Sequence, residues 1–206
     1  MEPKTLYEDA DIIALDKPAG VLTESLRYGI GHVHRLDRDT SGVLAFAKNQ
    51  EAYDFLRKAF TEREVKKEYL AFVYGVPKER KGTIDFDIGR SRKDFRLRSA
   101  QPKAKGKLRA SLTRYEVAGE DAGKKHALLR VFPETGRTHQ IRVHLKAIHH
   151  PIVCDPLYAP NHPCDLGFSR LGLHAAKIDV PLPGGGRITI ESPIPSDLAA
   201  AAAGFT

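Results

Sequence analysis

Residues 32–48 read HVHRLDRDTSGVLAFAK, which places a cluster of ionisable side chains directly before an apolar run. From Gly42 onward, the nearly continuous apolar character is typical of a strand that is buried on both faces. The preceding residues include two histidines, two arginines and two aspartates, more ionisable chemistry than a turn requires. Asp37 is flanked by Arg35 and Arg38, and a nearby guanidinium keeps a partly desolvated carboxylate ionised. Such a carboxylate can serve as a nucleophile or general base, although an aspartate in a turn is more often a local cap.

The elements around this stretch follow from hydrophobic periodicity and turn residues. Asn49 is predicted to cap a helix over 50–63 whose apolar residues recur at helical spacing. A second helix is predicted over 138–148, with Thr138 as its N-cap, and the alanine-rich C-terminal segment is expected to form a third. Strands are predicted over 12–15, 42–48, 67–75, 107–117, 125–132, 172–183 and 187–195.

Strands outnumber helices in this pattern, and a long alternation of strands and helices is missing. This predicts an α+β fold around a mixed, largely antiparallel sheet. The 206 residues can bury one core or two closely packed subdomains. No stretch approaches the roughly 20 apolar residues of a membrane span, and the first residues do not resemble a secretory signal. The two cysteines, Cys154 and Cys164, fit a reducing cytoplasm better than a disulfide framework.

The positive charge is concentrated in one segment. Residues 90–114 contain ten basic side chains and one acidic side chain, whereas the whole chain has a net charge of +7. A basic block on a nearly neutral body is the electrostatic pattern expected for a protein that binds a polyanion such as RNA. A solvated loop rich in lysine and arginine is the simpler alternative.

A second dense stretch, GRTHQIRVHL, covers residues 136–145. In a helix over this range, Arg142 lies near the N-terminus, where a positive charge opposes the helix dipole. Local stability therefore does not explain the arginine, which needs an anionic partner such as Asp37 or a phosphate. A surface arginine on an amphipathic helix is the alternative.

The sequence also has partial likenesses to a kinase catalytic loop, a magnesium site and a zinc site. The string HRLD does not match the residue order of a kinase catalytic loop, and no glycine-rich phosphate loop precedes it. Asp37 and Asp39 could hold a magnesium ion, but a two-metal nuclease needs further carboxylates. A zinc site could be drawn from the histidines and cysteines at 149, 150, 154, 162 and 164, whose spacing matches no paired Cys/His pattern.

Six motifs together resemble the RluA-type family of pseudouridine synthases, and they cover most of the chain in the family's order. They are KPAG (17–20), HRLDRDTSG (34–42), KKEYLAFVYG (66–75), GRTHQIRVHL (136–145), DPLY (155–158) and LHA (173–175). The resemblance implies a single catalytic domain over 1–206 with a central catalytic cleft, and no S4-type RNA-binding domain. It also implies an RNA pseudouridine synthase that converts uridine to pseudouridine in structured rRNA or tRNA without a cofactor. We expect a cytoplasmic monomer that binds no metal.

The resemblance assigns roles to single residues. Asp37 matches the catalytic aspartate, Arg142 the arginine that pairs with it, and Tyr69 the active-site tyrosine, which on its strand could equally be a core residue. Arg35 matches the side chain that holds the target nucleotide out of its stack. The residues expected to contact RNA are Arg35, Arg38, Arg92, Lys93, Arg96, Arg98, Arg137 and His139.

The segment 21–33 is shorter than the corresponding loop of most family members, which puts RNA recognition by this loop in doubt. A non-catalytic RNA-binding protein with the same fold is the main competing hypothesis. A metal-dependent nuclease is a third, and it predicts shortened RNA and sensitivity to chelators.

Overall fold

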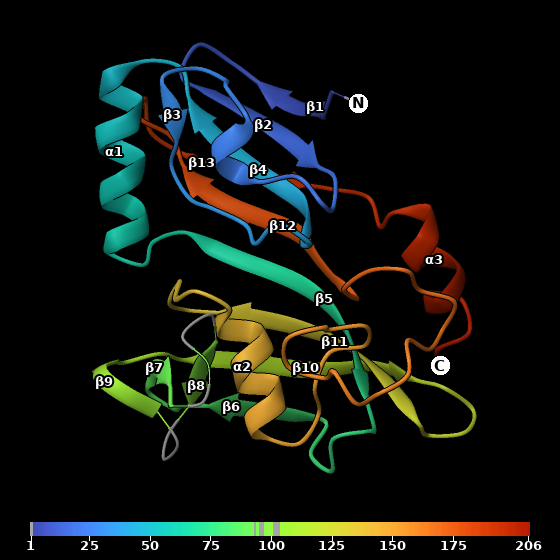
Figure 1. The fold of residues 1–206 in the computed structure, drawn as a ribbon. Coiled ribbons are helices and arrows are strands. Elements are labelled where there is room, and N and C mark those ends of the chain that lie inside the picture. Colours follow the sequence, from blue (N-terminus) through green and yellow to red (C-terminus); the bar gives the residue numbers. More distant parts are fainter. Residues whose placement is uncertain (1, 93, 95–96, 101–103) are drawn as a thin grey trace. The chain divides into compact units, whose positions relative to one another are not determined.

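The computed structural model describes residues 2–92, 94, 97–100 and 104–206 (Figure 1). The chain divides into two compact units, each built from two separate stretches of sequence. Unit 1 contains Met1–Glu68 and His174–Ile194, and unit 2 contains Tyr69–Leu173 and Pro195–Thr206.

Unit 1 is built on a mixed sheet. Strands β1, β2 and β4 follow one another in antiparallel order, β4 pairs in parallel with β12, and β13 and β3 add to β12 and β4 in antiparallel fashion. The strands are β1 (Lys4–Glu8), β2 (Ile12–Lys17), β3 (Gly31–His32), β4 (Ser41–Ala47), β12 (Leu173–Pro181) and β13 (Arg187–Glu191). A short 3-10 helix, η1 (Thr23–Ser25), and the helix α1 (Gln50–Thr61) complete the unit.

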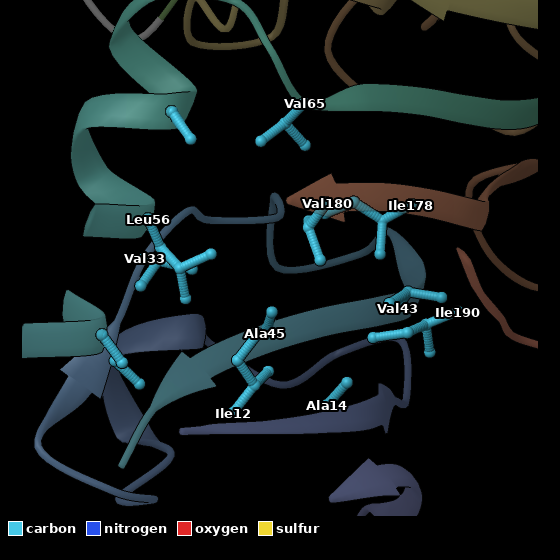
Figure 2. Packing of buried hydrophobic residues seen from close by; sticks show 13 residues of the cluster. Ile12, Ala14, Val33, Val43, Ala45, Leu56, Val65, Ile178, Val180 and Ile190 are labelled. Atoms are coloured by element: carbon cyan, nitrogen blue, oxygen red, sulfur yellow. The ribbon is translucent and has the colours of Figure 1, made fainter. Parts of the chain in front are cut away.

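All seven residues of β4 are buried, as the apolar run predicts. Figure 2 shows the core around this strand, in which Ala45 lies near Ile12 and Val43 lies beside Ile190 of β13. Helix α1 contributes Leu56 and two alanines to the same cluster. The side chain of Asn49 accepts a hydrogen bond from the Ala52 N–H at 2.9 Å, which confirms the predicted N-cap.

Unit 2 contains an antiparallel sheet with the strand order β5, β11, β10, β6. These strands are β5 (Lys66–Tyr74), β6 (Lys81–Ile84), β10 (Thr113–Glu120) and β11 (His126–Pro133). Helices α2 (Gln140–Ala147) and α3 (Ser196–Ala202) also belong to this unit. Ile141 and Leu145 of α2 join a buried cluster with residues of β5, β10 and β11.

A separate three-stranded sheet carries much of the positive charge. It consists of β7 (Ile88–Ser91) between β8 (Arg98–Ala100) and β9 (Ala104–Arg109), and we call it the basic sheet. Ile88 and Ala100 of this sheet form a small buried cluster with Val143 of α2 and Tyr158. The basic sheet is therefore packed against α2 (Figure 1).

Two local predictions are wrong. The single strand predicted over 107–117 is broken between β9 and β10, because Ser111 bonds to the Phe86 carbonyl at 2.6 Å and lies 3.1 Å from His144 Nε2. The N-cap of α2 is His139 in the left-handed region (φ 57°), not Thr138. Gln140 organises this helix start, since its side-chain oxygen accepts from the Arg137 N–H at 3.0 Å.

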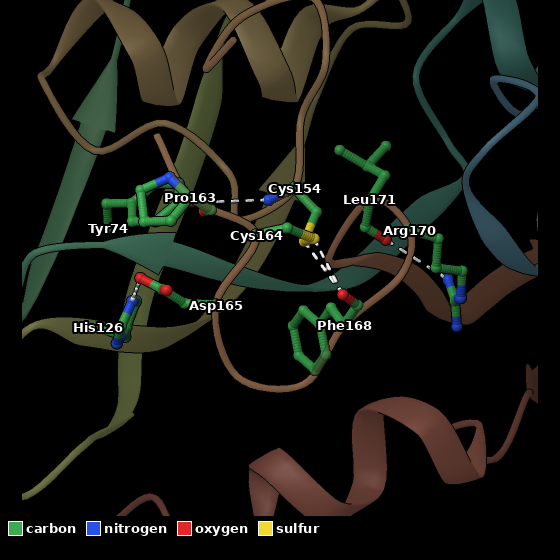
Figure 3. Close-up of a disulfide and its surroundings, with 9 residues drawn as sticks. All are labelled: Tyr74, His126, Cys154, Pro163, Cys164, Asp165, Phe168, Arg170 and Leu171. Carbon is green, nitrogen blue, oxygen red and sulfur yellow. Dashed lines mark hydrogen bonds and ion pairs between the residues drawn. A yellow bond between two sulfur atoms is a disulfide. The ribbon is translucent and has the colours of Figure 1, made fainter. Parts of the chain in front are cut away.

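The expectation for the cysteines is also wrong, because Cys154 and Cys164 form a disulfide with their Cα atoms 4.6 Å apart. The number of cysteines in a sequence does not show that the intervening residues 155–163 bring the two cysteines together in the fold. Figure 3 shows the disulfide beside Phe168 and close to Tyr74, whose hydroxyl donates to the Pro163 carbonyl. The disulfide closes a loop that begins at Asp155.

The predicted fold class is confirmed: the sheets are mixed or antiparallel, and the described residues form three α-helices beside many more strands. In the part of the chain that the structure describes, no helix is long and apolar enough to cross a membrane. The predicted single domain over 1–206 and its central cleft stay predictions.

Candidate active site

Asp37 lies in unit 1 on the turn between β3 and β4, and its side chain is partly exposed. The backbone on both sides of Asp37 is held in place. The Thr23 hydroxyl donates to the Leu36 carbonyl at 3.0 Å and accepts from the Leu36 N–H at 3.2 Å. The Gly20 N–H donates to the Arg38 carbonyl at 2.9 Å.

Lys17 provides a second contact to the residue after Asp37. Its side chain is fully buried, and its ammonium donates to the carbonyls of Pro18, Val21 and Arg38 at 2.8–2.9 Å. An ammonium has three donors, so three carbonyls offset its loss of hydration. The KPAG motif thus fixes the Asp37 turn from within unit 1.

The end of the turn is fixed by β12 and β13. His174 is fully buried; its Nε2 lies 3.2 Å from the Ser192 carbonyl, and its Nδ1 lies 2.9 Å from the Ser41 hydroxyl. Since a carbonyl only accepts, Nε2 carries a proton and donates to Ser192, and the Ser41 hydroxyl lies within hydrogen-bond distance of Nδ1. Gly42 has φ +115°, and a Cβ there would lie 2.1 Å from the Ala175 carbonyl oxygen. Only glycine fits at this position.

The two arginines beside Asp37 bind other carboxylates. Arg35 pairs with Glu24 at 3.0 Å, and Arg38 pairs with Asp39 at 3.0 Å. Both arginine side chains are more than half exposed, so these ion pairs contribute little to stability. The sequence predicts that Arg35 and Arg38 keep Asp37 ionised. In the structure, the positive charges of these two arginines also neutralise Glu24 and Asp39.

His34 is a partly buried base beside the same turn. Its Nε2 accepts a hydrogen bond from the Ala45 N–H at 3.0 Å, and its ring stacks on Phe60 with centroids 4.9 Å apart. Burial, together with the positive charges of Lys67 and His32, lowers the pKa of His34 to about 3. Burial also lowers the pKa of Lys67 to about 8. The imidazole of His34 is therefore a neutral hydrogen-bond acceptor.

Arg142 lies in unit 2, in the first turn of α2, and only 3% of it is exposed. It forms a bidentate ion pair with Asp155, with Nε 2.8 Å from Oδ2 and Nη2 2.7 Å from Oδ1. Asp155 is a partner that is not predictable from the sequence, although the DPLY motif contains it. Its charge offsets an arginine placed against the helix dipole. Pairing of Arg142 with Asp37 stays a prediction.

Tyr69 also lies in unit 2, on β5, opposite Val131 of β11. It is partly buried and packs against the cluster that contains Ala71 and Leu129. The described contacts therefore fit a tyrosine at the edge of a core, and its predicted catalytic role stays a prediction.

The other predicted RNA contacts have different surroundings. Arg92 is exposed next to β7, and Arg98 is partly buried in β8. Arg137 donates from Nε to the Ala110 carbonyl at 3.1 Å, and Nδ1 of His139 lies 2.9 Å from the Tyr158 hydroxyl. The predictions for Lys93 and Arg96 fall outside the described residues.

The metal alternatives find little support in the described residues. No group of three His, Cys, Asp or Glu side chains in this part of the chain is arranged to hold a metal ion. Both cysteines of the zinc alternative are in the disulfide. Asp39, the second carboxylate of the magnesium alternative, is paired with Arg38.

Comparison with known proteins identifies the family. The family described as RNA pseudouridylate synthase matches residues 11–147. An uncharacterized RNA pseudouridine synthase of Mycobacterium bovis is 40% identical over 220 residues, which cover 94% of this chain and 70% of that protein. The dual-specificity RNA pseudouridine synthase RluA of Vibrio cholerae is 37% identical over 190 residues, 84% of this chain and 75% of that protein.

A solved structure agrees with these matches. Human RNA Pseudouridylate Synthase Domain Containing 1 aligns with a TM-score of 0.83 and 30% identity, and the alignment covers 97% of this chain and 87% of that one. The chain belongs to the RNA pseudouridylate synthase family. Within it, the chain is an RluA-type RNA pseudouridine synthase, an isomerase that acts on RNA.

The Gly42→Ala variant is expected to lose at least about 3 kcal/mol of stability, because its Cβ would collide with the Ala175 backbone at a φ that favours glycine. Urea unfolding measures the loss. Gly184→Ala is the matched control, since a Cβ there meets nothing within 4 Å. Equal unfolding midpoints for the two variants would show that the close approach of Gly42 is not a constraint.

The pH dependence of stability should depend on His34. Its pKa is about 3 in the folded protein and 6.5 ordinarily, so the unfolded chain binds the extra proton between these values. Stability is then full above pH 6.5 and falls as the pH drops toward 3, by at most about 1.4 kcal/mol per pH unit. His34→Gln keeps an acceptor for Ala45 and should flatten this slope in urea unfolding, whereas the exposed His149→Gln should retain it.

Proposed function

We propose that this enzyme isomerises uridine in structured rRNA or tRNA, with Asp37 as its catalytic carboxylate. One observation carries the assignment. Asp37 is partly exposed, while Leu36 and Arg38 on either side of it are held by the buried side chains of Thr23 and Lys17. A reactive side chain must be presented by a rigid backbone, and this turn supplies one.

The proposed reaction breaks the C1′–N1 bond of uridine and forms a C1′–C5 bond. The Asp37 carboxylate attacks the nucleoside or assists departure of the base, after which uracil turns and rejoins the ribose through C5. The proton on C5 leaves, and N1 gains one, so that the product is an isomer of the substrate. No cofactor takes part in this scheme.

Arg142 and Tyr69 complete the proposed site. A guanidinium has five N–H donors, so an arginine that binds Asp155 through Nε and Nη2 can bind the Asp37 carboxylate as well. We assign to Tyr69 the stacking of the target base and the role of general base toward a ring or sugar proton.

RNA binding is assigned to exposed cations. The planar guanidinium of Arg35 is suited to hold the target nucleotide out of its stack, which costs a few kcal/mol that phosphate contacts offset. The basic sheet supplies such contacts through Arg90 and Arg109, and Arg92 directly after β7 supplies another; all three arginines are exposed. Arg38, Arg98, Arg137 and His139 are further proposed contacts, together with Lys93 and Arg96 of the same segment.

The RNA substrate is proposed as a class. The Vibrio cholerae relative is named a dual-specificity enzyme, so both rRNA and tRNA are to be tested. Mapping of the pseudouridines lost when the gene is deleted identifies the RNA and the uridine. We also propose that the enzyme acts as a monomer in the cytoplasm, and light scattering of the purified protein tests the first part.

The Asp37→Asn variant tests the assignment of the catalytic carboxylate. A carboxamide of nearly the same shape cannot act as the nucleophile, so we expect the reaction rate to fall by at least about 10³-fold. The measurement is tritium release from RNA labelled at C5 of uridine. RNA binding should stay within a few-fold of that of the wild-type enzyme.

Asp39→Asn is the matched control for this test. It removes a carboxylate two residues away that pairs with Arg38, and its rate should stay within a few-fold of the wild-type rate. Wild-type tritium release by Asp37→Asn would remove Asp37 from the mechanism. Intact RNA binding by a wild-type protein that releases no tritium would favour the non-catalytic hypothesis.

The basic sheet is tested by the salt dependence of RNA binding. Each phosphate contact contributes about 0.7–0.9 to the slope of log K against log salt, so neutralising four cations should lower the slope by about 3. The four substitutions are Arg90→Gln, Arg92→Gln, Arg98→Gln and Arg109→Gln. The control neutralises four exposed cations elsewhere, Lys4, Lys58, Arg63 and Lys125. Equal slopes for the two quadruple variants would show that the basic sheet does not contact phosphates.

A further inference from the structure

The ion pair between Arg142 and Asp155 is buried on both sides. The side chain of Arg142 is 4% exposed and that of Asp155 is 0% exposed. Two parallel N–H···O bonds, at Nε and Nη2, fix the plane of the guanidinium as well as its position. The direction in which the remaining donors of Arg142 point is therefore set by Asp155.

Asp155 is itself held in place by its own turn. Its Oδ1 atom accepts hydrogen bonds from the N–H groups of Leu157 and Tyr158, each at 3.0 Å. We call residues 155–158 the Asp155 turn. The disulfide joins Cys154, which directly precedes this turn, to Cys164, and so closes the loop that contains it. A carboxylate with three such restraints cannot follow the arginine if the arginine moves.

Tyr158 connects this turn to the basic sheet. Its hydroxyl accepts from the Arg98 N–H of β8 at 2.9 Å and lies 2.9 Å from Nδ1 of His139 at the start of α2. Its ring lies beneath the Arg142 guanidinium, with the Cζ atom 5.0 Å from the ring centroid. The tyrosine is only 3% exposed. One side chain thus contacts the sheet proposed to bind RNA, the N-terminus of α2 and the arginine itself.

We propose that Asp155 and Tyr158 are positioning residues of the isomerisation, which act through Arg142; this inference rests on the proposed function. Asp155 orients the guanidinium for the step at Asp37. Tyr158 ties the same guanidinium to the basic sheet, so that one turn holds both an RNA-contacting surface and a catalytic arginine. Neither residue needs to touch the RNA for this role.

A positioning role and a purely structural role predict different double-variant behaviour. Residues that act through one another are not additive, because once one is changed the other has nothing left to position. A purely structural pair instead shows its coupling in the free energy of unfolding and leaves the single-turnover rates of the folded single and double variants near that of the wild-type enzyme. Single-turnover rates of tritium release, measured with RNA labelled at C5 of uridine from cells that lack the gene, distinguish the two.

The first experiment compares Arg142→Lys, Asp155→Asn and the double variant. Lysine keeps a charge beside Asp155 but not the bidentate geometry, and asparagine keeps the shape of the aspartate. We expect each single variant to be at least about 10-fold slower than the wild-type enzyme, and the double variant to match the slower single variant. Rates of the folded variants near the wild-type rate, or a double-variant loss equal to the product of the two single losses, would overturn the proposal.

The second experiment uses Tyr158→Phe, which keeps the ring beneath Arg142 and removes the hydroxyl that binds Arg98 and His139. We expect KM for RNA to rise at least about 3-fold and by a larger factor than kcat falls, whereas Asp155→Asn should lower kcat more than it changes KM. Tyr115→Phe, at another buried tyrosine of unit 2, is the control and should leave both constants unchanged.

Folding of each variant is checked by circular dichroism and thermal unfolding. If Asp155→Asn does not fold, the comparison of Tyr158→Phe with Tyr115→Phe decides, and equal constants for these two overturn the proposal. A wild-type enzyme that releases no tritium would overturn the proposed function itself. Release by the wild-type enzyme together with multiplicative losses would overturn only the positioning roles.

Discussion

The desolvation of cations is the constraint on which both units depend. A buried ammonium or guanidinium is stable only where oxygen atoms replace its water. In unit 1, Lys17 is fully buried, and the carbonyls that accept its hydrogen bonds belong to two loops that are distant in sequence. Those loops must therefore meet at Arg38, which is the residue that follows Asp37. The need to replace the water around Lys17 therefore fixes the backbone position of both loops.

In unit 2, a carboxylate instead of carbonyls replaces the water around a buried cation. Arg142 is buried in the first turn of α2, where the helix dipole opposes its charge, and Asp155 supplies both the counter-charge and the matching geometry. Removal of one partner from such a pair leaves an uncompensated buried charge and costs about 3–5 kcal/mol. The pair is therefore difficult to separate, and a permanently oriented guanidinium follows from it.

Local signals in the sequence were sufficient for much of the fold. The cap at Asn49 and the apolar stripe of α1 lie within a few residues of one another, and the buried character of β4 is visible in its composition. The break within 107–117 was not predictable in this way. Ser111 leaves the strand pattern because Phe86 and His144 bind its hydroxyl, and both are far from it in sequence.

The residues of the candidate site also differ in how far the sequence alone predicts them. Asp37, Tyr69 and Arg142 were identified from motifs that resemble a family, since no local property of a lone aspartate or tyrosine distinguishes a catalytic role. Nothing in the sequence distinguishes Asp155 from the other residues of the DPLY motif. Asp155 gains its partner only in the folded chain, where the loop 155–163 brings it to Arg142 of α2. The disulfide that closes this loop also depends on the fold and cannot be predicted from the number of cysteines.

The segment 21–33 helps to hold the Asp37 turn. In this chain it forms the turn η1, and Thr23 from that turn binds both backbone groups of Leu36. A segment that is needed to hold the Asp37 turn has few residues left with which to grip RNA. Leu22 and Ile30, each 52% exposed, carry no charge for a phosphate. Arg27 is the one arginine of this segment and is exposed, whereas ten basic residues lie within 90–114, which include the strands of the basic sheet, so we expect most phosphate contacts there. On this reasoning, residues 21–33 serve mainly to hold the Asp37 turn, and the basic segment carries the larger share of the proposed RNA contacts.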